Sequence, residues 1–183
     1  MYNRPQNTQS APSVDHAAVA PRQLLLVLTG DILLAAIDLQ CVQQVIPLTA
    51  VQPLPKATGH LLGLLDLHGT GVPVMDLGLR LGLQEAKAYD LDTPIVICRC
   101  GGRLGGLVVQ EVLGASNLQA DEAQLEQTFA HGSPLFQAAA STDQGLALVV
   151  DLQRLLELDL SVPPGGHGAG DAIPTDREDD SQA

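Results

Sequence analysis

Two carboxylates and a histidine share one short stretch of the chain, GLLDLHGTGVPVMDL, residues 63–77. Asp66 and Asp76 bracket a glycine turn that also contains His68, so the two carboxyl groups could face each other across a β-hairpin. A facing pair of carboxyl groups can act as general acid and general base. The same residues would suit a hairpin whose polar side chains serve a binding surface.

Pairs of short apolar runs joined by tight turns predict four β-hairpins around this stretch. They join residues 23–28 to 32–37, 61–67 to 72–77, 94–100 to 103–109 and 136–141 to 146–152. Asp38 suits the N-cap of a short helical turn after the first hairpin, and three prolines keep residues 47–60 irregular. Four hairpins separated by short helices predict an all-β fold of the barrel type.

The hairpins repeat between the two halves of the sequence. GDILLAAIDLQCVQQVI resembles GGRLGGLVVQEVLGAS, and GVPVMDLGLRL resembles GLALVVDLQRLL. In both closing segments a buried strand ends in Asp-Leu, at Asp76 and at Asp151, where a carboxylate can accept hydrogen bonds from free backbone N–H groups of a short helix. We therefore expect two similar lobes, with both aspartates as helix caps and with Val74 and Val149 at matching core positions.

The sequence lacks the motifs of common enzyme and metal sites. HGTG has neither the Lys-Ser/Thr ending nor the long helix of a phosphate-binding loop, and G-x-S-x-G, H-E-x-x-H and C-x-x-C are absent. The histidines have no metal-ligand spacing: His16, His60, His68, His131 and His167. We expect no catalytic residue, no cofactor and no metal.

Composition and charge narrow the class of protein further. The chain has 183 residues, 45% of them apolar, and a net charge of −12, which argues against binding to nucleic acid. No apolar run reaches the length of a membrane span, and no export signal is visible, so we expect a cytoplasmic protein with reduced thiols. Cys98 and Cys100 share one face of a predicted strand and Cys41 is distant in sequence, which predicts buried structural thiols.

Two segments without hydrophobic periodicity frame the predicted domain, which covers residues 23–160. Residues 1–22 are rich in Pro, Ala, Ser, Asn and Gln, and residues 161–183 combine Pro and Gly with an acidic end. We expect both tails to be disordered, because they cannot bury enough apolar surface to offset the entropy of ordering.

Over roughly residues 22–158 the chain resembles the CheW-like domains of bacterial chemosensory arrays. The family pattern Gly-Val-x-Asn-Leu-Arg-Gly, followed by a variable pair and by Val/Ile-Pro-Val/Ile-x-Asp-Leu, reads here as GLLDLHG, TG and VPVMDL. An acid followed by Val-x-Glu-Val/Ile reads as Asp38 and VQQV at 42–45. The later elements, Gly-x-x-Val-Asp-x-Val and Asp-Leu-x-x-Leu-Leu, read as GLVVQEV at 106–112 and DLQRLL at 151–156.

The resemblance implies two SH3-like five-stranded β-barrel lobes with short helices around a shared core, without catalysis. It implies an adaptor that couples the cytoplasmic tip of methyl-accepting chemoreceptors to the regulatory domain of a CheA-type histidine kinase, with no direct insertion into the membrane. The pathway would be of the chemotaxis, surface-sensing or twitching type. The alternative is a free-standing interaction module of the same fold that docks a different partner.

The family motifs place partner-binding positions at Val42, Gln44, Gly63, Asp66 and His68. The chain departs from the family at three of them, with Asp66 in place of Asn, His68 in place of Arg and Gln44 in place of Glu. In the family, the Arg and the Glu are surface residues tied to partner contact, and the charge of a histidine depends on pH. Because both members of an opposite-charge pair differ, we expect Gln44 and His68 to be neighbours on one surface of a divergent coupling protein.

Overall fold

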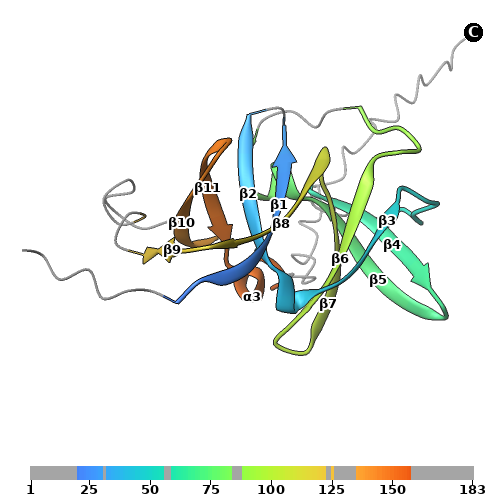
Figure 1. The fold of residues 1–183 in the computed structure, drawn as a ribbon. Helices are drawn as coiled ribbons and strands as arrows, with labels where there is room; N and C mark the ends of the chain where they lie inside the picture. The colour runs from blue at the N-terminus through green and yellow to red at the C-terminus, as the bar shows by residue number, and fades with distance from the viewer. Residues whose placement is uncertain are drawn as a thin grey trace, which may run out of the picture.

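The computed structural model describes residues 20–30, 32–55, 59–83, 88–122, 125 and 135–157, and its strands form two curled sheets (Figure 1). Lobe A contains β1 (Arg22–Thr29), β2 (Leu33–Asp38), β8 (Glu111–Leu118), β9 (Ala120–Asp121), β10 (Phe136–Thr142) and β11 (Gly145–Val150). Lobe B contains β3 (Val42–Pro47), β4 (Leu61–Leu67), β5 (Thr70–Asp76), β6 (Pro94–Cys100) and β7 (Arg103–Val108). The short helices are η1 (Leu39–Cys41), α1 (Leu77–Arg80) and α3 (Leu152–Leu155). The predicted all-β architecture is confirmed.

All four predicted hairpins form, with small differences at their turns. Thr70 and Gly71 belong to β5 and not to the turn before it, so that turn contains two residues, His68 and Gly69. The β6–β7 turn also has two residues, Gly101 and Gly102, both with positive φ, as the twist of a tight hairpin requires. The hairpin prediction omitted β8, whose buried and exposed residues alternate less clearly than those of the core strands.

The two lobes are similar, but they are not the two halves of the sequence. In order across the sheets, β8-β1-β2-β11-β10 of lobe A corresponds to β3-β6-β7-β5-β4 of lobe B. The parallel pair β2–β11 matches the parallel pair β7–β5. The β1–β2 hairpin therefore lies in the lobe built mainly from the second half, and β6–β7 lies in the lobe built mainly from the first. The repeat predicted two similar lobes correctly, and the structure adds that each lobe takes one hairpin from the other half of the chain.

Each lobe is closed by the segment that follows its outermost strand. In lobe A, β9 follows β8 and pairs with β10 on the opposite edge of the sheet. In lobe B, Gln52 follows β3 and forms a bridge with Leu64 of β4, with N···O distances of 2.8 and 2.9 Å in the two directions. Gly63 lies under this bridge with φ of 150°, and a Cβ there would collide with the Gln52 carbonyl oxygen. In lobe B, this single bridge therefore takes the place that β9 has in lobe A.

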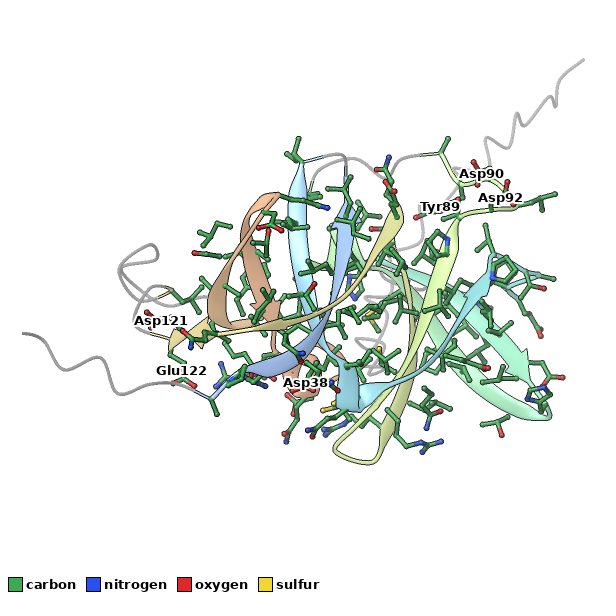
Figure 2. The ribbon with its side chains drawn as sticks, viewed as in Figure 1. Asp38, Tyr89, Asp90, Asp92, Asp121 and Glu122 are labelled. Atoms are coloured by element: carbon green, nitrogen blue, oxygen red, sulfur yellow. The ribbon has the colours of Figure 1, made fainter. Side chains whose placement is uncertain are left out.

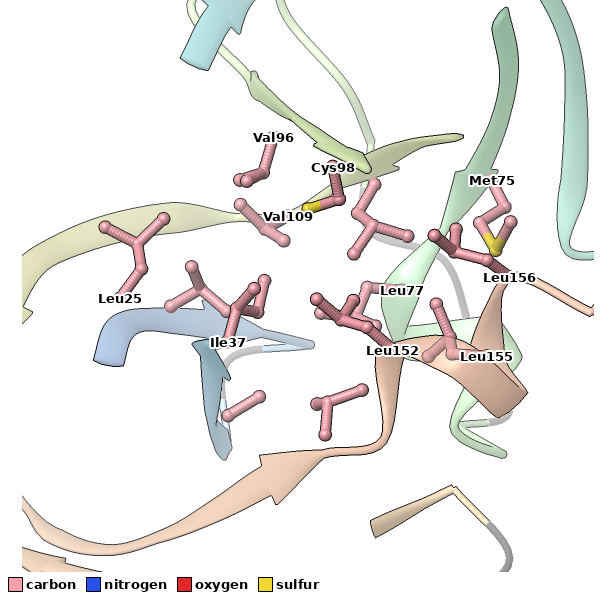
Figure 3. Packing of buried hydrophobic residues seen from close by; sticks show 14 residues of the cluster. Leu25, Ile37, Met75, Leu77, Val96, Cys98, Val109, Leu152, Leu155 and Leu156 are labelled. Atoms are coloured by element: carbon pink, nitrogen blue, oxygen red, sulfur yellow. The ribbon is translucent and has the colours of Figure 1, made fainter. Parts of the chain in front are cut away.

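The buried side chains form one core between the lobes and one core inside each lobe. The shared core combines strands of both lobes with residues of α1 and α3, and Figure 3 shows Leu25, Ile37, Met75, Leu77, Val96, Cys98, Val109, Leu152, Leu155 and Leu156. The core of lobe A is rich in alanine, and that of lobe B in valine and isoleucine. Val149 and Val74 are completely buried in these two cores, which confirms them as matching positions.

The predicted tails lie outside the described residues except for residues 20–22. Arg22 is the first residue of β1, one position before the predicted start of the domain. Its guanidinium forms an ion pair with Asp38 at 2.8 Å. Asp38 also caps η1 by accepting a hydrogen bond from the Gln40 backbone N–H, as predicted.

Candidate partner-binding site

The β4–β5 turn presents His68 at an exposed hairpin tip. His68 has a φ of 51° and Gly69 a φ of 82°, the left-handed pair that a two-residue hairpin turn needs. Histidine adopts this region more readily than most residues do, although glycine tolerates it best. The Asp66 carboxylate accepts a hydrogen bond from the Gly69 N–H at 2.7 Å and so braces the turn. The structure therefore brings Gly63, Asp66 and His68 together on one hairpin.

Asp76 lies at the opposite end of this hairpin from Asp66 and is buried. Asp66 pairs with Gly71 near the tip, whereas the backbone N–H of Asp76 donates to the carbonyl of His60, just before β4. The Asp76 carboxylate accepts hydrogen bonds from the Leu79 N–H, at 2.7 Å, and from the Tyr89 hydroxyl. Two carboxyl groups facing each other across the hairpin, as the spacing allowed, do not occur.

The two aspartates of the sequence repeat have the same structural role. Asp76 caps α1, and Asp151 caps α3 by accepting a hydrogen bond from the Arg154 N–H at 3.1 Å. Asp76 additionally accepts a hydrogen bond from the hydroxyl of Tyr89, which lies in the segment before β6. Burial, followed by the contact with Asp76, raises the pKa of Tyr89 above its usual value. The predicted capping role is confirmed for both aspartates.

Val42 and Gln44 lie on β3, at the edge of the lobe B sheet opposite β4 in hydrogen-bonding order. Val42 packs against the shared core, and Gln44 is half-buried. The pairing of β3 with β6 shifts between them, because Val42 pairs with Cys98 and Gln44 pairs with Ile97. The bulge leaves Gln43 without a partner residue on β6 and sets the direction of Gln44.

Lobe A contains a position equivalent to Gln44. The pairing of β8 with β1 shifts in the same way, because Val112 pairs with Val27 and Gly114 pairs with Leu26. Since β8 corresponds to β3 and β1 to β6, Gly114 occupies the place of Gln44. Neither the bulges nor this equivalence could be read from the sequence, because the two segments share few residue types.

Lobe A also contains a position equivalent to His68. The turn between β10 and β11 consists of Asp143 and Gln144, and it matches His68 and Gly69 in the β4–β5 turn. Gly114 and Asp143 line one cavity of about 210 Å³ at the mouth of lobe A, between β8 and this turn. The remaining residues that line it are Leu26, Leu113, Ala115, Ser116, Leu118, Ser141, Thr142 and Gln144.

A second cavity, of about 220 Å³, opens where the two lobes meet, at the ends of β1, β5 and β7. Its lining includes the buried Asp76 and the exposed Asp90 and Asp92. Figure 2 shows Tyr89, Asp90 and Asp92 in the loop before β6, with Asp38 at the other end of the molecule. Hydrogen bonds from Thr93 lower the pKa of Asp90. This cavity could not be predicted from the sequence, because residues that are distant along the chain form it.

The described part of the chain contains neither a candidate metal site nor a candidate membrane-spanning helix. No group of three or more His, Cys, Asp or Glu side chains there has the arrangement of a metal site. Among the same residues, no helix has the length and apolar character needed to cross a bilayer.

The family model of the CheW-like domain matches residues 23–159. The chain belongs to the CheW-like family. The match covers the strands of both lobes, including β10 and β11, the C-terminal strands that complete lobe A. Members of this family are scaffolds without catalytic activity, and this CheW-like chain is accordingly not an enzyme.

Curated relatives of the CheW-like chain are named chemotaxis protein CheW. The protein from Klebsiella aerogenes is 25% identical over 122 residues, which cover 66% of this chain and 73% of the relative. The protein from Thermotoga maritima is 24% identical over 124 residues, which cover 67% of this chain and 80% of the relative. The crystal structure of scaffolding protein TtCheW from Thermoanaerobacter tengcongensis matches with a TM-score of 0.67 and 20% identity, covering 76% of this chain and 94% of that one. This structural match supports the SH3-like fold of both lobes.

Proposed function

We propose that this CheW-like protein is a cytoplasmic adaptor that couples the tips of methyl-accepting chemoreceptors to the regulatory domain of a CheA-type histidine kinase. The main support is the match of the family model to both lobes, together with relatives that are named chemotaxis protein CheW. An adaptor of this kind needs surfaces and no reactive groups, and the aspartates that could have suggested catalysis are occupied as helix caps and as a turn brace.

Reconstitution with receptor and kinase tests this function. Adding the protein to a receptor cytoplasmic fragment and a CheA-type kinase from the same organism should raise receptor-dependent kinase phosphorylation. The protein should itself show no turnover of nucleotide. Binding to neither the kinase regulatory domain nor the receptor fragment would refute the adaptor function.

We further infer that Gln44 and His68 belong to one docking surface at the mouth of lobe B. Their equivalents Gly114 and Asp143 line a single cavity at the mouth of lobe A, and the five-strand correspondence between the lobes supports the same arrangement in lobe B. Asp66 would contribute by holding the turn that carries His68. Val42 and Gly63 would contribute by fixing β3 and the bridge that closes the lobe.

The charges at this surface should control partner choice more than folding. An exposed ion pair contributes only about 0–1 kcal/mol to stability, whereas a charge change at an interface alters specificity and association rate. We expect Gln44→Glu with His68→Arg to leave the melting temperature within a few degrees of the parent. The same double variant should bind conventional receptor tips more tightly.

A double-mutant cycle on receptor and kinase binding measures whether the two positions act together. A coupling energy above about 0.5 kcal/mol is expected if they share one surface. Asp143→Arg provides a matched control, because it places an arginine in the equivalent turn of lobe A. Strictly additive effects of the two substitutions, or an equal effect of the control, would refute the shared surface.

The replacement of the family's Glu by Gln44 and of its Arg by His68 also favours a second candidate function. In this alternative the protein is a free-standing interaction module of the same fold that docks a partner outside receptor–kinase coupling. Titration with the receptor fragment and with the kinase regulatory domain separates the two, because the alternative predicts that neither binds even after Gln44→Glu and His68→Arg restore the family charges.

A further inference from the structure

The three cysteines converge at one place, although Cys41 is far from the other two in sequence. Cys41 ends η1, which connects β2 of lobe A to β3 of lobe B, and Cys100 ends β6. Val42 pairs with Cys98, so Cys41, one residue before Val42, lies beside the end of β6, where its thiol interacts with that of Cys100. Both are partly exposed and pack against the shared core, whereas Cys98 is completely buried in it. The prediction of buried thiols is confirmed for Cys98 alone.

We propose that Cys41 and Cys100 form a reversible disulfide when the protein meets a small-molecule disulfide such as glutathione disulfide. Because the pairing of β3 with β6 already places these two cysteines on neighbouring segments, little backbone movement is needed to join them. Cys98 is a poor partner for Cys100, because two strand steps separate their Cα atoms by about 6.6 Å, near the upper limit for a disulfide. All three cysteines are free thiols in this structure.

The reaction is two successive thiol–disulfide exchanges. The thiolate of one cysteine attacks a sulfur of glutathione disulfide, forming a mixed disulfide and releasing one glutathione thiolate. The thiolate of the second cysteine then attacks the protein sulfur of the mixed disulfide, forming the Cys41–Cys100 bond and releasing the second glutathione. Two protein thiols lose two electrons in total, glutathione disulfide gains them, and the two thiol protons pass to the two glutathione thiolates. Excess dithiol reverses both steps.

The surroundings of Cys41 make the bond slow to form at neutral pH. Burial is the main cause that raises the pKa of Cys41 to about 12, and contacts with Cys100 and Asp38 act in the same direction. Arg22 opposes them by favouring the thiolate. Cys98 nearby also has its pKa raised by burial, and unlike Cys41 it is completely buried, so glutathione disulfide has no access to it. Because the thiolate reacts, the exchange rate should rise as the pH is raised above 7.

The experiment incubates the full chain with glutathione disulfide at pH 8 and then alkylates the remaining thiols under native and unfolding conditions. Peptide mass spectrometry should find a Cys41–Cys100 bridge and Cys98 alkylated only after unfolding. The melting temperature should rise by several degrees, since the bridge closes a long loop, and should return with dithiothreitol. The rate at pH 8 should exceed that at pH 7.

Three variants identify the reacting pair. Cys98→Ala should keep the bridge, whereas Cys41→Ser and Cys100→Ser should each abolish it and leave at most a glutathione adduct on the remaining thiol. A bridge that involves Cys98, disulfide-linked dimers, stable glutathione adducts in place of a bridge, or three free thiols after the treatment would each overturn the proposal.

Discussion

Replacing Asp76 by alanine should cost about 3 kcal/mol of unfolding free energy, much more than the same change at Asp151. Loss of a helix N-cap typically costs about 1 kcal/mol. Asp76 also accepts the Tyr89 hydroxyl, and a hydrogen bond to a charged group contributes about 1.5–3 kcal/mol. Asp151 caps α3 but is less buried, and its ion pair with Arg154 is largely exposed, so Asp151→Ala should cost about 1 kcal/mol.

Urea unfolding of the full chain, followed by circular dichroism, measures this difference as a shift in midpoint at constant slope. Tyr89→Phe should cost less than Asp76→Ala, because it keeps the cap of α1. A double-mutant cycle on Asp76→Ala and Tyr89→Phe should give an interaction energy of about 1–2 kcal/mol between the two side chains. A carboxylate retained for chemistry would behave differently, since removing such a group often leaves stability unchanged or raises it. Equal costs at Asp76 and Asp151, or a neutral Asp76→Ala, would refute the capping argument.

Other substitutions test the packing, the closure of lobe B and the titration of Tyr89. Val74→Ala and Val149→Ala should each cost about 1–3 kcal/mol in urea unfolding, because each leaves a cavity in a completely buried site, and two neutral results would refute the lobe correspondence. Gly63→Ala should be more destabilising than Gly69→Ala in a thermal melt, since both have positive φ but only the first meets backbone atoms. The raised pKa of Tyr89 means that its stabilising contribution is complete below pH 10 and declines as pH rises beyond that value, so Tyr89→Phe should flatten the loss of stability measured between pH 9 and 11.

Local features of the fold were predictable because they depend on neighbouring residues. Alternating apolar runs and glycine turns located the hairpins, and Asp-Leu before a Leu/Arg segment located the capped helices. Asp76 shows the limit of this reasoning, because its cap follows from sequence whereas its bond to Tyr89 depends on a loop that returns to the end of β5. The spacing that suggested a facing pair with Asp66 failed because seven residues of β5 separate the tip of the hairpin from its base.

Features that depend on pairing between distant strands could not be predicted. The two halves of the chain carry nearly the same hydrophobic pattern, so nothing in that pattern shows that β1–β2 belongs to lobe A and β6–β7 to lobe B. The approach of Cys41 to Cys100 depends on the pairing of β3 with β6, which brings together segments from different halves. The equivalence of Gln44 with Gly114 depends on two bulges that differ in sequence.

Each lobe takes one hairpin from the other half of the chain, and this arrangement has a consequence during synthesis on the ribosome. The β1–β2 hairpin emerges first, but its neighbours in the sheet are β8 and β11, and β11 begins only at Gly145. At a translation rate of about 5–20 residues per second, both outer edges of the hairpin wait for roughly 5–20 seconds before lobe A can close. During that interval its apolar face, which includes Leu24, Leu26 and Ala36, has no core to enter. The nascent chain therefore has an extended period in which a chaperone that holds exposed strands would protect it from aggregation.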